Sequence, residues 1–138
     1  MVLKVKRIHT DAKLPTRGTP HSAGLDLYLL EGLVVHPGET KKVPLGIQVA
    51  IPEGHVGLIH ARSSAFLKGA EVDGVVDSDF RGEVHLMIRS NCDRPVVAEA
   101  GSKIAQMVVV PVASLVVEEA FELPATVRGE GGFGSSGK

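Results

Sequence analysis

The clearest pattern in the chain is a strict alternation of apolar and other residues over residues 43–51. The apolar positions are Val43, Leu45, Ile47, Val49 and Ile51. A period of two places alternate side chains on the same face of a strand. We therefore predict one strand here, with one face on a core.

Shorter apolar runs recur along the chain and are separated by turn signals. The runs cover residues 2–8, 33–35, 55–60, 84–88, 104–110 and 115–121. The turn signals are Pro37-Gly38, Pro52-Glu53-Gly54, Asp73-Gly74, Arg81-Gly82 and Ala100-Gly101. Many short strands at this spacing predict an all-β sandwich or jelly roll, and not a parallel sheet with crossover helices.

Two segments depart from the strand pattern. A short helix is predicted to open at Ser63-Ser64 and to close at Gly69, where glycine can adopt the left-handed conformation. From about Gly129 the chain becomes glycine-rich, and such a tail is expected to be mobile on its own. Phe133 argues against a pure spacer, because an aromatic ring can close over a flat ligand.

The overall composition limits the class of protein. A length of 138 residues fits one domain, and 43% hydrophobic with 22% charged residues is typical of a soluble globular protein. A net charge of −1 gives no reason to expect a nucleic acid or a membrane as a partner. With a single cysteine, Cys92, and neither a secretion signal nor a membrane-spanning stretch, we expect a cytoplasmic, intracellular protein.

Arg62, Ser63 and Ser64 combine a guanidinium, two hydroxyls and the free backbone N–H groups of a helix start. This combination favours a phosphate site. An ordinary serine cap beside a surface arginine is the alternative.

Polar residues elsewhere suggest further chemistry. In the hairpin that follows Val75-Val76, the carboxylates Asp77 and Asp79 can activate water or interact with a phosphate-bound metal, or can satisfy local backbone N–H groups. Gln106 lies inside an apolar strand, so its amide either satisfies backbone groups or faces a polar ligand.

Read in order, five segments resemble the motifs of the trimeric dUTPase (deoxyuridine 5′-triphosphate nucleotidohydrolase) family. They are residues 23–28, 61–64, 74–82, 101–106 and 128–137. The resemblance implies hydrolysis of dUTP to dUMP and pyrophosphate with Mg²⁺, which keeps uracil out of DNA and supplies dUMP for dTMP synthesis. It also implies a distorted jelly-roll (β-clip) subunit in a homotrimer, whose three sites each draw motifs from all three chains.

The same resemblance assigns roles to residues. Asp77 is the expected base for the water that attacks the α-phosphorus, with Arg62 and Gln106 completing the catalytic set. Asp26 supports the phosphate side, and Mg²⁺ is held mainly by the triphosphate and water, with no certain protein ligand. The expected substrate-binding residues are Ser63, Ser64, Gly74, Val75, Val76, Phe80, Arg128, Phe133, Gly134, Ser135 and Ser136. Residues 1–127 form the expected domain, and residues 128–138 form a swapped arm that closes over the site, with Phe133 on the uracil.

The chain departs from the family pattern at Phe80, where tyrosine is usual, and over residues 68–73, which look slightly short. Phenylalanine still excludes a 2′-hydroxyl sterically, so we expect sugar discrimination to persist. Two alternatives remain: a zinc-free dCTP deaminase of the same fold, and a non-catalytic nucleotide-binding or signalling module on this scaffold.

Overall fold

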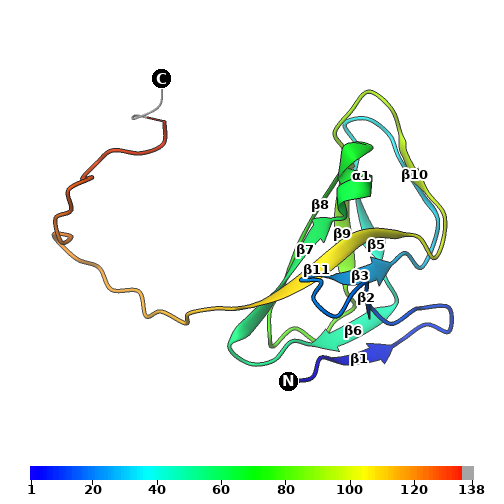
Figure 1. Cartoon of the computed structure of the whole chain (residues 1–138), viewed down its shortest axis with the longest axis horizontal. Coiled ribbons are helices and arrows are strands. Elements are labelled where there is room, and N and C mark those ends of the chain that lie inside the picture. Colours follow the sequence, from blue (N-terminus) through cyan, green and yellow to red (C-terminus); the bar gives the residue numbers. More distant parts are fainter. Residues whose placement is uncertain (135–138) are drawn as a thin grey trace.

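A computed structural model describes residues 1–134 as a body of short strands with one helix, followed by a long extended segment (Figure 1). The strands are β1 (Lys4–Arg7), β2 (Thr16–Arg17), β3 (Leu25–Tyr28), β4 (Leu33–Val35), β5 (Thr40–Pro44), β6 (Ile47–Ala50), β7 (His55–Ala61), β8 (Ala70–Val76), β9 (His85–Ser90), β10 (Val96–Ala98) and β11 (Lys103–Pro111), and the helix is α1 (Ser63–Leu67). The predicted all-β class with one short helix is confirmed.

One large sheet and two small ones form the body. The large sheet has seven strands in the order β2-β3-β11-β7-β8-β9-β5, and the pairs β1-β6 and β10-β4 form two-stranded sheets. All of these strand pairs are antiparallel. No helix among residues 1–134 has the length and apolar content needed to cross a membrane.

The single strand predicted over residues 43–51 is wrong, although all five of its alternating apolar residues are buried. The chain bends at Gly46, whose φ of 72° lies in the left-handed region. Before the bend β5 pairs with β9, and after it β6 pairs with β1. The alternation therefore predicted correctly which side chains are buried. It did not indicate that residues before Gly46 join one sheet and residues after it join another.

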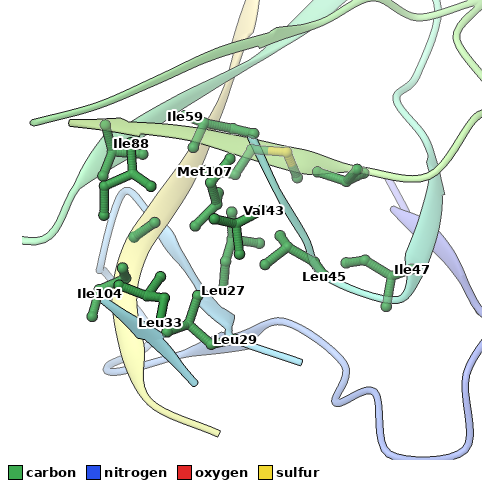
Figure 2. Packing of buried hydrophobic residues seen from close by; sticks show 14 of the residues in the cluster. Leu27, Leu29, Leu33, Val43, Leu45, Ile47, Ile59, Ile88, Ile104 and Met107 are labelled. Atoms are coloured by element: carbon green, nitrogen blue, oxygen red, sulfur yellow. The ribbon is translucent and has the colours of Figure 1, made fainter. Parts of the chain in front are cut away.

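The core is formed by apolar side chains from both the large and the small sheets. Figure 2 shows the side chains of Leu27, Leu45, Ile59, Ile88 and Met107 clustered between the strands, and each is less than 2% exposed. Burial on this scale is the main favourable term that holds the strands together.

The turn predicted at Asp73-Gly74 is also wrong, because both residues lie inside β8. A Cβ atom at Gly74 would lie 3.2 Å from the Cβ atom of Ile59 on β7. Glycine is needed at this position for close packing against the neighbouring strand, not for a turn.

Residues 115–121 form no strand in the chain, contrary to the prediction. Leu115, Val116, Val117 and Phe121 are 83% to 104% exposed. Figure 1 shows the segment after β11 leaving the body, where no strand lies beside it. A strand pattern can form a strand only where a partner edge exists, and a single copy of the chain offers none here.

Helix α1 follows the prediction closely. It spans Ser63–Leu67, and Gly69 has a φ of 94° just after it. The backbone of Arg62 is extended and makes no side-chain cap, while its N–H donates to the carbonyl of Ile104 (2.9 Å). The helix start is thereby fixed to β11.

Candidate functional site

Five of the predicted site residues line one cavity of about 410 Å³, here called the polar pocket. It lies where the loop before β3, the start of α1 and strand β11 meet. Its lining residues are Gly18, Ser22, Gly24, Asp26, Arg62, Ser63, Ser64 and Gln106.

Strand register brings these side chains together. Gln106 on β11 pairs with Asp26 on β3 at one side and with His60 on β7 at the other. Directly paired residues in a sheet point to the same face. Arg62 follows β7 immediately, so it reaches the same end of the same face.

Asp26 is tied to two cations. Its carboxylate is only 12% exposed, and it lies 3.2 Å from Nε of Arg62 and 3.8 Å from Nζ of Lys103. The Arg62 guanidinium also donates to the carbonyl of Lys103 (3.1 Å). Two cations for one carboxylate leave a net positive charge in this cluster, although Lys103 itself lies beside the pocket and does not line it, and such a charge favours an anionic ligand nearby.

The Gln106 amide both bonds to a backbone group and faces the polar pocket, the two alternatives that the sequence left open. Its Nε2 donates to the carbonyl of Ala61 (3.3 Å), and the side chain also lines the polar pocket. A Cβ atom at Gly24 would lie 3.1 Å from the Cβ of Gln106 and would collide with its amide oxygen. Gly24 is therefore needed to leave room for this amide.

Ser63 and Ser64 are exposed, and within residues 1–134 their hydroxyls make no hydrogen bond. The cap predicted as the alternative for these residues does not form. Both hydroxyls are therefore open to a ligand in the polar pocket.

A second cavity of about 350 Å³, here called the hairpin pocket, contains four other predicted residues. Its lining residues are Lys42, Ile59, Gly74, Val75, Val76, Phe80, Glu83, Val84, His85 and Met87. The Phe80 ring lies against Gly82, where a Cβ atom would come within 2.6 Å of the ring Cζ. Glycine at that position therefore lets the ring fold back over the turn.

Asp77 and Asp79 are exposed in the turn that closes the hairpin. Within the described residues neither carboxylate has a hydrogen bond or an ion pair, so neither satisfies local backbone N–H groups as the alternative predicted. The turn is held instead by its own main chain, where the N–H of Phe80 donates to the carbonyl of Asp77 (3.1 Å).

Among the residues that the structure describes, the two pockets share no lining residue. Asp77 follows Val76, which pairs with Gly57 near the start of β7, whereas Arg62 follows the end of β7. At about 3.3 Å per residue, Asp77 and Arg62 are on the order of 20 Å apart along the strand. Within one chain Asp77 therefore does not meet Arg62 and Gln106.

The C-terminal segment lies away from both pockets. Arg128 is exposed, and its Nε donates to the carbonyl of Gly131 (2.6 Å) within the segment itself. Phe133 is fully exposed with a φ of 49°, and Gly134 is exposed. Ser135 and Ser136 lie outside the described residues.

Sequence reasoning missed Gly24 and Lys103 as parts of the polar pocket region. Lys103 forms its ion pair with Asp26 beside the polar pocket, next to a register shift in the pairing of β11 with β3 between Lys103 and Ala105. A larger cavity of about 810 Å³ beside β10 contains only Ser64 of the predicted residues. No group of three or more His, Cys, Asp or Glu side chains among residues 1–134 could hold a metal ion.

Comparisons with known proteins cover almost the whole chain. The dUTPase family model matches residues 10–137. The deoxyuridine 5′-triphosphate nucleotidohydrolase of Syntrophotalea carbinolica is 41% identical over 99% of this chain and 97% of its own length. The enzyme of the same name from Hydrogenobaculum sp. is 43% identical over 99% of each chain.

The fold has a similarly close counterpart among solved structures. The dUTPase of Staphylococcus bacteriophage 80alpha with dUpNHpp superposes with a TM-score of 0.92 at 28% identity, covering 99% of both chains. The matched region thus includes both pockets and the C-terminal segment.

Proposed function

The chain belongs to the dUTPase family and hydrolyses dUTP to dUMP and pyrophosphate, and from this premise we propose that each active site is assembled from different copies of the chain in a homotrimer. The separation of the polar pocket from the hairpin pocket carries this proposal. Each pocket holds half of the chemistry that the reaction needs, so the hairpin of one copy must meet the polar pocket of another.

The polar pocket is proposed to bind the triphosphate. Arg62 supplies a charge that is fixed in place by Asp26, and Ser63 and Ser64 supply free hydroxyls. Gln106 is anchored through Ala61 and presents its amide to the phosphates. Phosphoryl transfer depends largely on positioning and charge neutralisation, which this set of donors provides.

The hairpin pocket is proposed to bind the deoxyuridine. Main-chain groups around Gly74, Val75 and Val76 read the uracil edge, and cytosine is rejected because its donors and acceptors would leave buried groups unpaired. The Phe80 ring packs on the sugar and excludes a 2′-hydroxyl. Comparable turnover of UTP and dUTP would contradict this role of Phe80.

Asp77 is proposed as the general base. It takes a proton from water as the water oxygen bonds to the α-phosphorus, and the bond to the pyrophosphate oxygen breaks, with the electron pair leaving on pyrophosphate. The exposed, unpaired carboxylate at the tip of the hairpin supports this role, since it is accessible to a second copy.

Mg²⁺ is proposed to be held mainly by triphosphate oxygens and water. The residues present fit this arrangement, because Asp26, the only carboxylate among residues 1–134 that lines the polar pocket, is already paired with Arg62 and Lys103. When bound, the ion neutralises charge that develops on the phosphates.

Residues 128–138 are proposed as an arm that closes over the site on top of the domain formed by residues 1–127. Phe133 stacks on the uracil ring, and Arg128, Gly134, Ser135 and Ser136 approach the phosphates. The full exposure of Phe133 in one copy supports a partner elsewhere.

Exposed apolar surface supports the homotrimer. Val75 and Met87 are 62% and 47% exposed on the outward face of the large sheet, and Leu115, Val116 and Val117 are almost fully exposed beyond it. Apolar surface of this kind typically marks a protein interface. In the cell we place the enzyme in the cytoplasm, with no nucleic-acid or membrane partner, where it keeps uracil out of DNA and supplies dUMP.

Pyrophosphate release from dUTP, dCTP, UTP and dTTP, with and without Mg²⁺, tests the activity. Fast release from dUTP alone, stimulated by Mg²⁺, is expected. Release from none of the four would contradict the proposed reaction, and ammonia release from dCTP would favour the deaminase.

Subunit mixing tests the composite site. Chains carrying Asp77→Asn and chains carrying Arg62→Ala are each expected to be nearly inactive, but assemblies refolded from both should regain activity at sites with one intact half from each. As a matched control, mixing Asp77→Asn with Phe80→Ala should restore nothing, because both changes affect the same hairpin and no site would then receive an intact one. Equal behaviour of the two mixtures would refute the shared site.

A further inference from the structure

Glu83 connects the catalytic hairpin to the body of the subunit. Its Oε2 accepts a hydrogen bond from the backbone N–H of Gly46, 37 residues away in sequence (2.8 Å). Within residues 77–83, all of which the structure describes, no other side chain has a hydrogen bond outside the turn, since the Arg81 guanidinium donates only to Ser78 and Phe80.

Gly46 offers a fixed anchor for this bond. It stands at the bend between β5 and β6 with a φ of 72°, and a Cβ atom there would lie 2.9 Å from the Cβ of Ala12. Its carbonyl accepts from the N–H of Ile8 (2.9 Å). Because the bend takes Gly46 out of both strands, its N–H has no strand partner, and the Glu83 carboxylate supplies the acceptor.

The residue after Glu83 is held at the same place. The N–H of Val84 donates to the carbonyl of Ile47 (2.8 Å), and its carbonyl accepts from the N–H of Leu45 (3.1 Å). Val84 is 2% exposed. The bonds of residues 83–84 to the bend at residues 45–47 are here called the clamp. The exposed turn of residues 77–82 is held in place by this clamp at one end and by β8 at the other.

We infer that Glu83 is a positioning residue for the hairpin pocket. Through its bond to Gly46 it fixes the turn of residues 77–82, which carries Phe80, and so sets the space for the deoxyuridine. This inference rests on the proposed role of that pocket. Glu83 and Phe80 line the same cavity, and the other carboxylate oxygen of Glu83 lies 4.0 Å from Nε2 of His85. The carboxylate is thus flanked on both sides, and it acts through Phe80 without contacting the reacting atoms.

The test compares Glu83→Ala with Glu83→Gln, whose amide oxygen can still accept from Gly46. Glu83→Ala is expected to raise KM for dUTP about tenfold with kcat nearly unchanged, and Glu83→Gln to restore most of the loss. Hydrogen exchange at the Gly46 amide should speed up in Glu83→Ala and stay close to wild type in Glu83→Gln. Glu31→Ala, at an exposed carboxylate outside both pockets, is the matched control and should change neither readout.

Glu83→Asp keeps the charge, but its shorter side chain does not reach Gly46, so it should behave like Glu83→Ala. It replaces Glu83→Ala in the test if Glu83→Ala does not fold. Wild-type KM in a variant whose Gly46 amide exchanges faster would overturn the inference, and so would unchanged exchange. If the unaltered protein released no pyrophosphate from dUTP, the proposed function would fail, while exchange at Gly46 would still decide whether the clamp exists.

Discussion

The polar pocket and the hairpin turn differ in what holds their functional side chains. In the pocket, Asp26 and Gln106 lie on the paired strands β3 and β11, Arg62 directly follows β7, and all three are bonded to one another or to neighbouring main chain. In the turn, Asp77 has no side-chain partner among residues 1–134, and the bonds run within the turn itself. Within one copy of the chain the polar pocket is therefore held together by side-chain bonds, whereas the carboxylate of the hairpin turn is not; under the proposed composite site, assembly would position it.

The largest loss of activity should come from a change in the hairpin turn, at Asp77. Asp77→Asn is expected to lower kcat by about 10²- to 10⁴-fold, because it removes the proposed base, while binding of a non-hydrolysable dUTP analogue stays near wild type. Steady-state pyrophosphate release and calorimetry separate the two quantities. Asp79→Asn, an equally exposed neighbour, is the matched control and should cost far less. Near-normal turnover of Asp77→Asn would place the base elsewhere.

Removal of the arm extends the comparison to the least packed part of the chain. Ending the chain at Val127 is expected to lower kcat/KM on the order of 100-fold, comparable to losing a donor that stabilises the transition state. The midpoint of thermal unfolding should hardly move, because the described residues Arg128, Phe133 and Gly134 are exposed and Arg128 bonds only within the segment itself. Full activity in the truncated chain would be incompatible with a closing arm.

A smaller loss of activity is expected from a change in the polar pocket, at Gly24. Gly24→Ala should lower kcat/KM by about tenfold, because the new methyl group displaces the Gln106 amide from its place. A double-mutant cycle with Gln106→Ala checks the reason: once the amide is gone, Gly24→Ala should cost little more. Fully additive losses would mean that Gly24 acts through something other than Gln106.

The smallest effect is expected on stability, from a change at Glu39, which lines neither pocket. The N–H of His36 donates to its carboxylate (3.1 Å) and lowers the pKa of Glu39, with Lys41 assisting. A lowered pKa stabilises the fold above the unfolded-state value, and that contribution disappears as the pH falls through the folded-state value. Glu39→Gln should therefore reduce the urea midpoint slightly at neutral pH, and the gap to wild type should close at acid pH. A gap that persists in acid would rule out the charge as its source.

Local signals predicted local features well. Ser63 and Gly69 located the only helix among the described residues, and the alternation over residues 43–51 identified five buried side chains. The bend at Gly46 was not predictable, because an alternating pattern continues unchanged whether or not the chain changes sheet. The motif resemblance singled out Asp26, Arg62 and Gln106, and the structure places all three in the lining of one pocket.

Features that depend on strand register or on a free sheet edge could not be predicted from the local sequence pattern. The pairing of Lys103 with Asp26 lies next to a register shift between β11 and β3, and no local pattern encodes it. Residues 115–121 have the composition of a strand but no edge to join in their own subunit.

The distance between the two pockets links turnover to the abundance of the chain. If neither half works alone, dilution below the dissociation constant of the assembly removes activity from molecules that are still correctly folded. Specific activity should then fall steeply as the enzyme is diluted, and adding catalytically dead chains with an intact polar pocket should partly rescue it. The fold would in this way make catalysis a property of a population of chains, not of each one.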